Sequence, residues 1–320
     1  MHRMRCLVTG GAGFVGSHLV DSLITAGHDV VVVDNLHTGS WENIKHLEGY
    51  CNFDFIEEDV ANELYIDGPI DRIYHLACPA SPPHYQEDMV KTLLTNTHGI
   101  YNILSLAKKK GAKVLFTSTS EIYGDPHVHP QPETYWGNVN TLGPRSCYDE
   151  GKRCAEAYCY AFANQHNLQV RIARIFNTFG PRMNPEDGRV VSNFILASLQ
   201  GEPLKIYGDG KQTRSFMYVD DLVRGLMLLM ESDNTMNCVP VNIGNPVEYT
   251  ISDWAEVVKD EVSKFTSIDC SNIEYIEASI DDPKQRKPDI SRAIEKLGWK
   301  PEVDVIDGVI KTIAYFSGFI

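Results

Sequence analysis

The sequence lacks any long hydrophobic run, since no stretch approaches the ~18–20 apolar residues that a membrane-spanning helix requires. The first apolar strand is expected within a few residues of Met1, which leaves no room for a signal peptide. Internal repeats, low-complexity tracts and flexible linkers are also missing. We therefore expect a cytoplasmic globular protein with no membrane partner.

Basic residues are scarce: 29 Lys and Arg stand against 43 Asp and Glu, for a net charge of −14. A nucleic-acid binder would present a basic face, so no nucleic-acid partner is expected. Single basic residues are often just solvated surface charge. As a group beside glycine turns, however, those of the C-terminal part suggest an anionic ligand such as a nucleotide sugar. They are Arg182, Arg189, Lys211, Arg214, Arg286 and Lys287.

The eight cysteines include no Cys-x-x-Cys pair, and their intervals fit no zinc pattern. Scattered cysteines of this kind are typical of free thiols in a reducing compartment. Cys147 has the chemistry of a nucleophile, but a packing role is favoured. His127 and His129 have no further ligands at suitable spacing, so we expect surface loop residues and no metal.

A glycine-rich turn near the N-terminus follows an apolar strand and precedes a helix and a second strand ending at Asp34. Gly10 permits the tight turn, Gly13 lets the backbone approach a pyrophosphate, and Gly16 lets the helix pack on the strand. The helix N-terminus then faces the phosphate charge. Asp34 can accept hydrogen bonds from ribose hydroxyls and would repel a 2′-phosphate, which favours NAD over NADP.

Strands and helices continue to alternate, so the fold class is α/β, a Rossmann-type doubly wound parallel sheet with a smaller C-terminal substrate-binding domain. We expect residues 1–180 to form the NAD-binding domain, with later segments returning to it, and residues 181–320 to be mainly substrate-binding. Strands are expected at 5–9, 30–33, 53–57, 72–77, 113–117, 169–176, 204–207 and 241–244, and helices at 17–26, 93–111, 147–167, 188–200, 219–231, 251–264 and 291–297.

Tyr148 and Lys152 lie four residues apart, on one face of an expected helix. An ammonium beside a phenol lowers the pKa of the phenol, which makes a general base for a sugar hydroxyl. The spacing also occurs by chance on amphipathic helices. Residues 117–121, Thr-Ser-Thr-Ser-Glu, end a strand at the ligand-binding edge, although a hydroxyl-rich turn would have the same composition. With the glycine loop, these features predict a hydride-transfer site.

These motifs resemble the extended short-chain dehydrogenase/reductase family that acts on nucleotide sugars. Within the family, residues 148–153 and 282–289 are most similar to the UDP-glucuronic acid decarboxylases, or UDP-xylose synthases. The resemblance covers nearly the whole chain. Two departures stand out: Cys78 replaces the usual serine, and Leu94 occupies the region of a usual lysine, for which Lys91 can substitute.

The resemblance implies that NAD⁺ takes a hydride from C4 of UDP-glucuronate while Tyr148 removes the O4 proton. Lys152 keeps the phenol acidic, and Thr119 binds O4. The resulting 4-ketone lies β to the carboxylate, so CO₂ leaves. Arg214 orients the carboxylate and Glu121 acts near C5. The hydride then returns, giving UDP-xylose.

The resemblance further implies a homodimer built on the helices near residues 96–110 and 147–167. The implied cofactor-binding residues are Gly10, Gly13, Phe14, Val15, Gly16, Asp34, Asn35, Thr38, Gly39, Asp59, Val60, Leu76, Tyr148, Lys152, Thr178 and Arg189. The implied substrate-binding residues are Ser120, Glu121, Asn177, Arg189, Tyr207, Gln212, Arg214 and Arg286.

Other activities on the same scaffold stay open at this point. A UDP-sugar 4-epimerase would not need Arg214 near a carboxylate. A dTDP-glucose 4,6-dehydratase needs an Asp-Glu pair after the threonine, whereas Thr119 is followed by Ser120 and Glu121. An oxidative decarboxylase would release the UDP-4-keto-pentose with NADH. A regulator that binds NAD without catalysing a reaction is disfavoured, because the chain retains all the residues predicted for catalysis.

Overall fold

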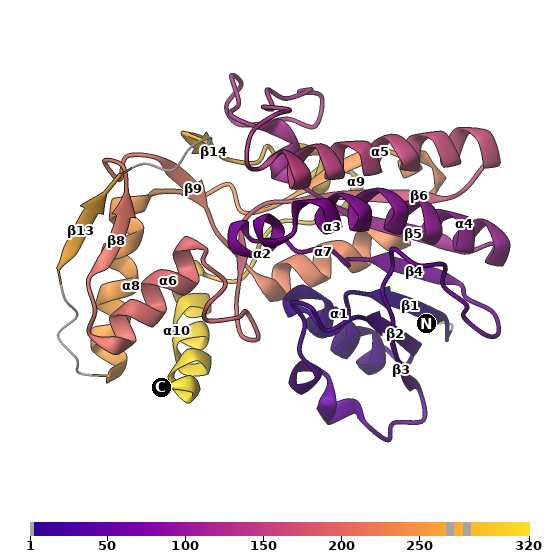
Figure 1. Cartoon of the computed structure of the whole chain (residues 1–320), viewed down its shortest axis with the longest axis horizontal. Coiled ribbons are helices and arrows are strands. Elements are labelled where there is room, and N and C mark those ends of the chain that lie inside the picture. The colour runs from indigo at the N-terminus through magenta and orange to yellow at the C-terminus, as the bar shows by residue number, and fades with distance from the viewer. Residues whose placement is uncertain (1–2, 267–271, 278–282) are drawn as a thin grey trace.

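A seven-stranded parallel sheet forms the centre of the molecule in the computed structural model, which describes residues 3–266, 272–277 and 283–320 (Figure 1). The strand order is β11-β6-β5-β4-β1-β2-β3. The chain reverses direction across the sheet between β1 and β4, the switch point where such sheets bind ligands. The prediction of a Rossmann-type doubly wound sheet is therefore confirmed. The strands are β1 (Arg5–Thr9), β2 (Asp29–Asp34), β3 (Phe53–Glu57), β4 (Arg72–His75), β5 (Lys113–Thr119), β6 (Val170–Ile175) and β11 (Pro240–Ile243).

Strand β5 extends two residues beyond its predicted end. Thr119 still pairs with Ile175 of β6, so its side chain is held by the sheet rather than by a loop. The strand buries six of its seven residues. A parallel strand covered by helices on both faces reads as a nearly continuous apolar run, which is why the sequence pattern located it. The extension fixes Thr119 at the ligand-binding edge.

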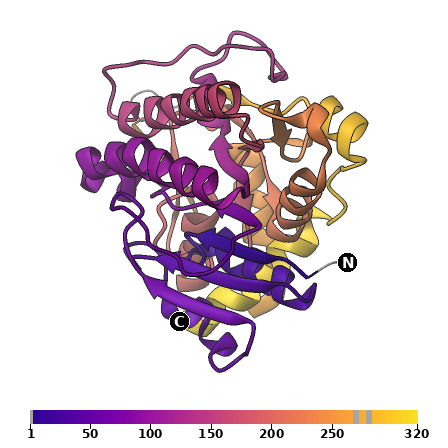
Figure 2. The same ribbon diagram turned by 90° about the vertical axis from the view of Figure 1, so that its right-hand side faces the viewer.

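Helices cover both faces of the sheet. Helices α1 (Phe14–Thr25) and α7 (Val219–Glu231) pack together on one face. The other face carries α4 (Ile100–Lys110) and α5 (Ser146–His166), which lie side by side in Figure 2 as the purple and magenta helices. Across the described ranges, none of the helices is both long and apolar enough to cross a membrane.

The helix predicted at 93–111 is divided by a π-helical turn. It consists of α3 (Met89–Leu94), the π-turn η3 (Thr95–Gly99) and α4. Side chains within the turn bond back to main-chain carbonyls: Asn96 Nδ2 lies 3.0 Å from Thr92 O. Such back-bonding competes with the regular helical ladder. Gly151 lets α5 approach this turn closely, because a Cβ there would come within 3.0 Å of Asn96.

The C-terminal part packs beside the sheet, around Trp254, which is fully buried and stacks on Phe216 with ring centroids 4.2 Å apart (Figure 1). The remaining α-helices are α2 (Pro82–Glu87), α6 (Val190–Gln200), α8 (Ile251–Thr266), α9 (Ser291–Leu297), which contacts β11, and α10 (Val305–Phe316). The short strands are β7 (Thr178–Phe179), β8 (Leu204–Tyr207), β9 (Thr213–Ser215), β10 (Met217–Tyr218), β12 (Glu248–Thr250), β13 (Ile273–Ile276) and β14 (Gln285–Arg286). The seven described cysteines are free thiols; Cys270 lies outside the described residues.

Candidate active site

A cavity of 1370 Å³ follows the carboxyl ends of β1, β2, β4, β5 and β6 and continues to β8 and β9. Single small-molecule pockets usually measure about 300–1,000 Å³, so this one has room for two ligands. Every residue predicted for catalysis, cofactor binding or substrate binding lines it. The structure thus brings the whole predicted set together, while the role of each residue stays a prediction.

The glycine loop has the shape that a dinucleotide requires. Gly10 has a φ of +72°, and a Cβ there would come within 2.7 Å of the Ala77 nitrogen. A Cβ on Gly16 would lie 2.0 Å from Gly10 O. Gly13 caps the start of α1 in an extended conformation, without a side chain. The loop therefore presents bare backbone and a helix N-terminus to the cavity, which suits a pyrophosphate.

Asp34 is held rigidly at the end of β2. Its two carboxylate oxygens accept hydrogen bonds from the backbone nitrogens of Ala12, at 3.0 Å, and Leu36, at 2.9 Å. Burial raises the pKa of Asp34, and the two backbone hydrogen bonds oppose that shift. A carboxylate fixed beside the glycine loop is placed for ribose hydroxyls, as in other dinucleotide folds.

A second acid, Asp59, lies next to Asp34 along the cavity. It accepts a hydrogen bond from Asn35 at 3.0 Å and forms an ion pair with Lys91. Burial opposes ionisation, but hydrogen bonds from Lys91 and other neighbours hold the pKa of Asp59 below its ordinary value. Lys91 lines the cavity, whereas Leu94 is 37% exposed outside it. Lys91 is therefore the cation that this part of the site contains.

Tyr148 and Lys152 are both buried and face the cavity from α5. The Tyr148 ring stacks on Tyr85, with centroids 5.1 Å apart and planes 9° apart. Lys152 Nζ lies 5.8 Å from the centre of the Tyr148 ring and donates to Thr117 O at 2.9 Å. The expected pKa of Tyr148 needs correction, because burial raises it well above the ordinary value. Burial also lowers the pKa of Lys152.

Glu121 is surrounded by arginines. Its carboxylate forms ion pairs with Arg145 and Arg286, and Arg286 also lies 3.4 Å from the Ser120 hydroxyl. Burial opposes ionisation, yet the charges of Arg286, Arg145 and Arg214 hold the pKa of Glu121 below its ordinary value. Arg286, one of the predicted substrate-binding residues, therefore lies beside the acid predicted to act at C5.

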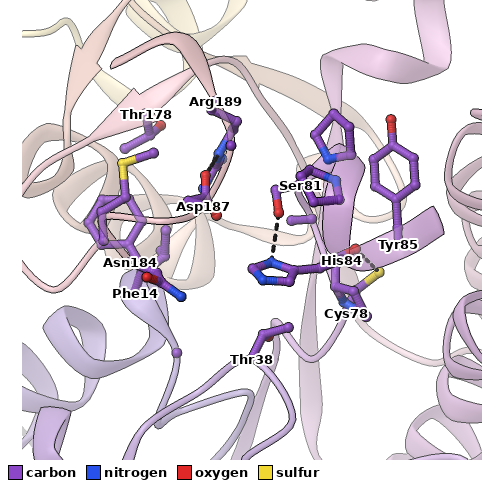
Figure 3. A pocket seen from close by; sticks show the side chains of 18 of the residues that line it. Phe14, Thr38, Cys78, Ser81, His84, Tyr85, Thr178, Asn184, Asp187 and Arg189 are labelled. Carbon is purple, nitrogen blue, oxygen red and sulfur yellow. Dashed lines mark hydrogen bonds and ion pairs between the residues drawn. The ribbon is translucent and has the colours of Figure 1, made fainter. Parts of the chain in front are cut away.

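Arg189 faces the same cavity from the start of α6. It forms an ion pair with Asp187. Burial lowers the pKa of Arg189, but the interaction with Asp187 outweighs burial, so the pKa is raised. Figure 3 shows this pair across the cavity from the start of α2, where the Ser81 hydroxyl lies 2.8 Å from His84 Nδ1. Arg189 also lowers the pKa of Tyr148, so it acts electrostatically on the predicted base.

The cavity residues that were not predicted include three that contact predicted ones: Tyr85, Arg145 and Asp187. Asp149 was not predicted either, and it borders a side cavity. Arg145 carried a usable signal, because it lies three residues before Tyr148 and so about one helical turn away. Tyr85 had no comparable signal, since its stacking on Tyr148 joins segments distant in sequence.

Comparisons with known proteins agree with this geometry. The model of the "NAD dependent epimerase/dehydratase family" matches residues 6–244. UDP-glucuronic acid decarboxylase 1 of Danio rerio is 56% identical over 98% of this chain and 73% of its own length. UDP-glucuronic acid decarboxylase 6 of Arabidopsis thaliana is 55% identical over 96% and 87%, respectively.

A solved structure of UDP-glucuronic acid 4-epimerase from Bacillus cereus, with UDP-glucuronic acid and NAD, is similar at a TM-score of 0.87. It is 29% identical, and the match covers 99% of this chain and all of that one. The predicted resemblance, the prediction of an enzyme and the prediction of NAD as cofactor are confirmed. The chain belongs to the NAD dependent epimerase/dehydratase family.

Proposed function

We propose that this protein decarboxylates UDP-glucuronate to UDP-xylose and CO₂, with NAD regenerated in each cycle. The observation that carries the proposal is the cluster of Arg145, Arg214 and Arg286 around Glu121, in the same cavity as Tyr148. Three guanidinium groups gathered at one end of the cavity suit a substrate that brings its own carboxylate. The names of the relatives at 52–56% identity support the same substrate and reaction.

The glycine loop and Asp34 would hold the adenosine half of NAD, and Lys152 the nicotinamide ribose. When bound, NAD supplies reversible hydride acceptance at C4 of the sugar. Tyr148 takes the O4 proton and later returns it, and Thr119 orients the hydroxyl. Because burial raises the pKa of the phenol, the cations Lys152 and Arg189 have to favour the phenolate once ligands exclude water.

The substrate carboxylate would lie at the arginine cluster. Arg286 is 2% exposed and touches both Glu121 and Ser120, so we assign it, together with Arg214, to the carboxylate end of the substrate. Tyr207 and Gln212 lie further along the cavity, where Gln212 Nε2 donates to Tyr207 O at 2.6 Å. They are assigned to UDP. Residues 181–320 would then mainly bind substrate.

Recognition of the carboxylate can be tested by comparing the affinities for UDP-glucuronate and UDP-glucose with NAD present. We expect UDP-glucuronate to bind more tightly by about tenfold or more, since hydrogen bonds to charged groups contribute about 1.5–3 kcal/mol each. Arg214→Gln and Arg286→Gln should reduce that preference. Lys287→Gln is the matched control, because Lys287 lies outside the cavity and near Glu248, at 3.9 Å. Equal affinities in the unmodified protein would contradict the assignment.

We also propose that the protein works as a cytoplasmic homodimer through α4 and α5. These helices lie side by side and expose Tyr101 and Tyr160, at 49% and 64%. Sedimentation velocity is the test: Tyr101→Glu and Tyr160→Glu together should shift the dimer towards monomer. A sedimentation coefficient that the double substitution leaves unchanged, or a monomeric unmodified protein, would contradict this interface.

A further inference from the structure

A second, smaller cavity of 300 Å³ is lined in part by Glu121. It shares Glu121, Arg145 and Pro283 with the main cavity, so the two meet at the arginine cluster. The rim includes three exposed polar residues, and the cavity therefore reaches solvent. Its lining residues are Glu121, Gly124, Asp125, Asn138, Val139, Asn140, Arg145, Asp149 and Pro283.

Asp149 is the buried acid of this side cavity, with only 6% of its surface exposed. One carboxyl oxygen, Oδ1, has no hydrogen-bond partner among the described residues. The other, Oδ2, lies 3.9 Å from Arg145 Nε, and Arg145 contacts Glu121 in turn. A buried carboxylate without hydrogen bonds is costly, so this geometry favours the neutral acid.

The charged groups around Asp149 favour a proton on it. Burial and the negative charge of Glu121 raise its pKa, whereas Arg145 and Arg286 lower it and Glu150 raises it further. Burial also favours a proton on Glu121, but the arginines keep that side chain ionised. The two carboxyl groups thus hold one proton between them at neutral pH. Asp149 carries this proton, in contact with a cavity that reaches water.

The proposed reaction consumes a proton in each turnover. Breaking the C5–carboxylate bond releases neutral CO₂ and leaves the electron pair on the sugar, as an enolate shared with the 4-ketone. A new C5–H bond must form before the ketone is reduced. The carboxylate has left as CO₂ and brings no proton, and the O4 proton held by Tyr148 is needed again at O4. The C5 proton must therefore come from solvent.

We propose that solvent protons reach C5 through this side cavity, relayed by Asp149 to Glu121. In the relay, Asp149 passes its proton through cavity water to the ionised Glu121, the protonated Glu121 delivers it to C5 and becomes ionised again, and cavity water restores the proton of Asp149. Glu121 touches the substrate end of the site, whereas Asp149 acts only through Glu121. The inference rests on the proposed decarboxylation.

Asp149→Asn tests the relay, because asparagine keeps the shape of the neutral acid and cannot pass a proton. In single turnovers with NAD and UDP-glucuronate, CO₂ release should keep its rate. UDP-xylose formation should slow by about 10- to 100-fold, at the low end of general acid catalysis. The enolate, recovered as UDP-4-keto-pentose after quenching, and NADH should accumulate together, and the solvent deuterium isotope effect on xylose formation should rise. Asp54→Asn is the matched control, since Asp54 is exposed on β3 and lines neither cavity.

A purely structural role for Asp149, such as holding Arg145, would slow oxidation, decarboxylation and reduction alike. That result, or unchanged xylose formation in the variant, would overturn the relay. If the variant does not fold, the relay can still be tested on the unmodified protein. Its C5 protonation rate should fall at alkaline pH as Asp149 loses its proton, and a pH-independent rate would overturn the relay. Absence of CO₂ release from the unmodified protein would refute the decarboxylase itself, a separate outcome.

Discussion

Replacing Gly16 with alanine tests how the glycine loop binds NAD. The new Cβ would lie 2.0 Å from Gly10 O and 2.8 Å from Gly11 Cα, both backbone atoms. Ordinary contact begins at 3.4 Å, so the start of α1 must move by more than an ångström. Overpacking of this kind costs about 1–3 kcal/mol, and each kcal/mol lowers the melting temperature by about 2–4 °C in domains of 150–250 residues.

Isothermal titration with NAD and thermal denaturation should be measured on three variants. Gly16→Ala should lose both stability and NAD affinity. In Gly13→Ala the Cβ meets only Gly10 O, at 3.2 Å, so this variant should fold well but bind NAD more weakly, since the methyl group faces the pyrophosphate. Gly318→Ala meets nothing within 4 Å and should match the unmodified protein. Unchanged NAD affinity in Gly16→Ala would refute the reasoning.

Three other substitutions give distinct results. Tyr148→Phe keeps the ring stacked on Tyr85 and loses the proton-accepting oxygen. Turnover should therefore fall by about 100-fold or more while NAD still binds. Near-normal turnover would contradict the role of Tyr148 as general base. Asp34→Asn removes a charge that repels a 2′-phosphate. The preference for NAD over NADP should therefore fall by about tenfold or more when the two cofactors are titrated in parallel. An unchanged preference would show that Asp34 does not discriminate between them. Asp149→Asn should change the pH dependence of stability. The pKa of Asp149 is raised in the folded state, so its stabilisation is present at low pH and is lost as pH rises through the raised value. The melting temperature of the variant minus that of the unmodified protein should therefore grow from about pH 5 to pH 8, and a constant difference would show that Asp149 does not titrate there.

The sheet could be predicted because its signals are local. Residues 30–33 form an unbroken valine run, and the glycine loop precedes a helix that begins close to its expected start. Because the strands are parallel, their carboxyl ends all lie at the same edge of the sheet, independent of the side chains that they carry. This is why residues as distant as Asp34, Tyr148 and Arg214 could be expected near one another, and all three line one cavity.

The details of the site depend on contacts that spacing along the chain does not encode. Arg286 and Glu121 are 165 residues apart, and their ion pair depends on β14 pairing with β9. The prediction for the pKa of Tyr148 was wrong because four-residue spacing suggests proximity to Lys152 and says nothing of burial. The π-turn at Thr95–Gly99 was missed because hydrophobic periodicity runs through it.

The most direct test of the proposed function is to incubate the purified protein with UDP-glucuronate and a trace of NAD⁺. CO₂, NADH absorbance and the mass of the nucleotide sugar should be followed together. The proposal predicts CO₂ in step with a UDP-pentose of the mass of UDP-xylose, and no lasting NADH. Accumulating NADH with a UDP-keto-pentose would indicate an oxidative decarboxylase. A UDP-hexuronate epimer without CO₂ would contradict the proposal and indicate a 4-epimerase.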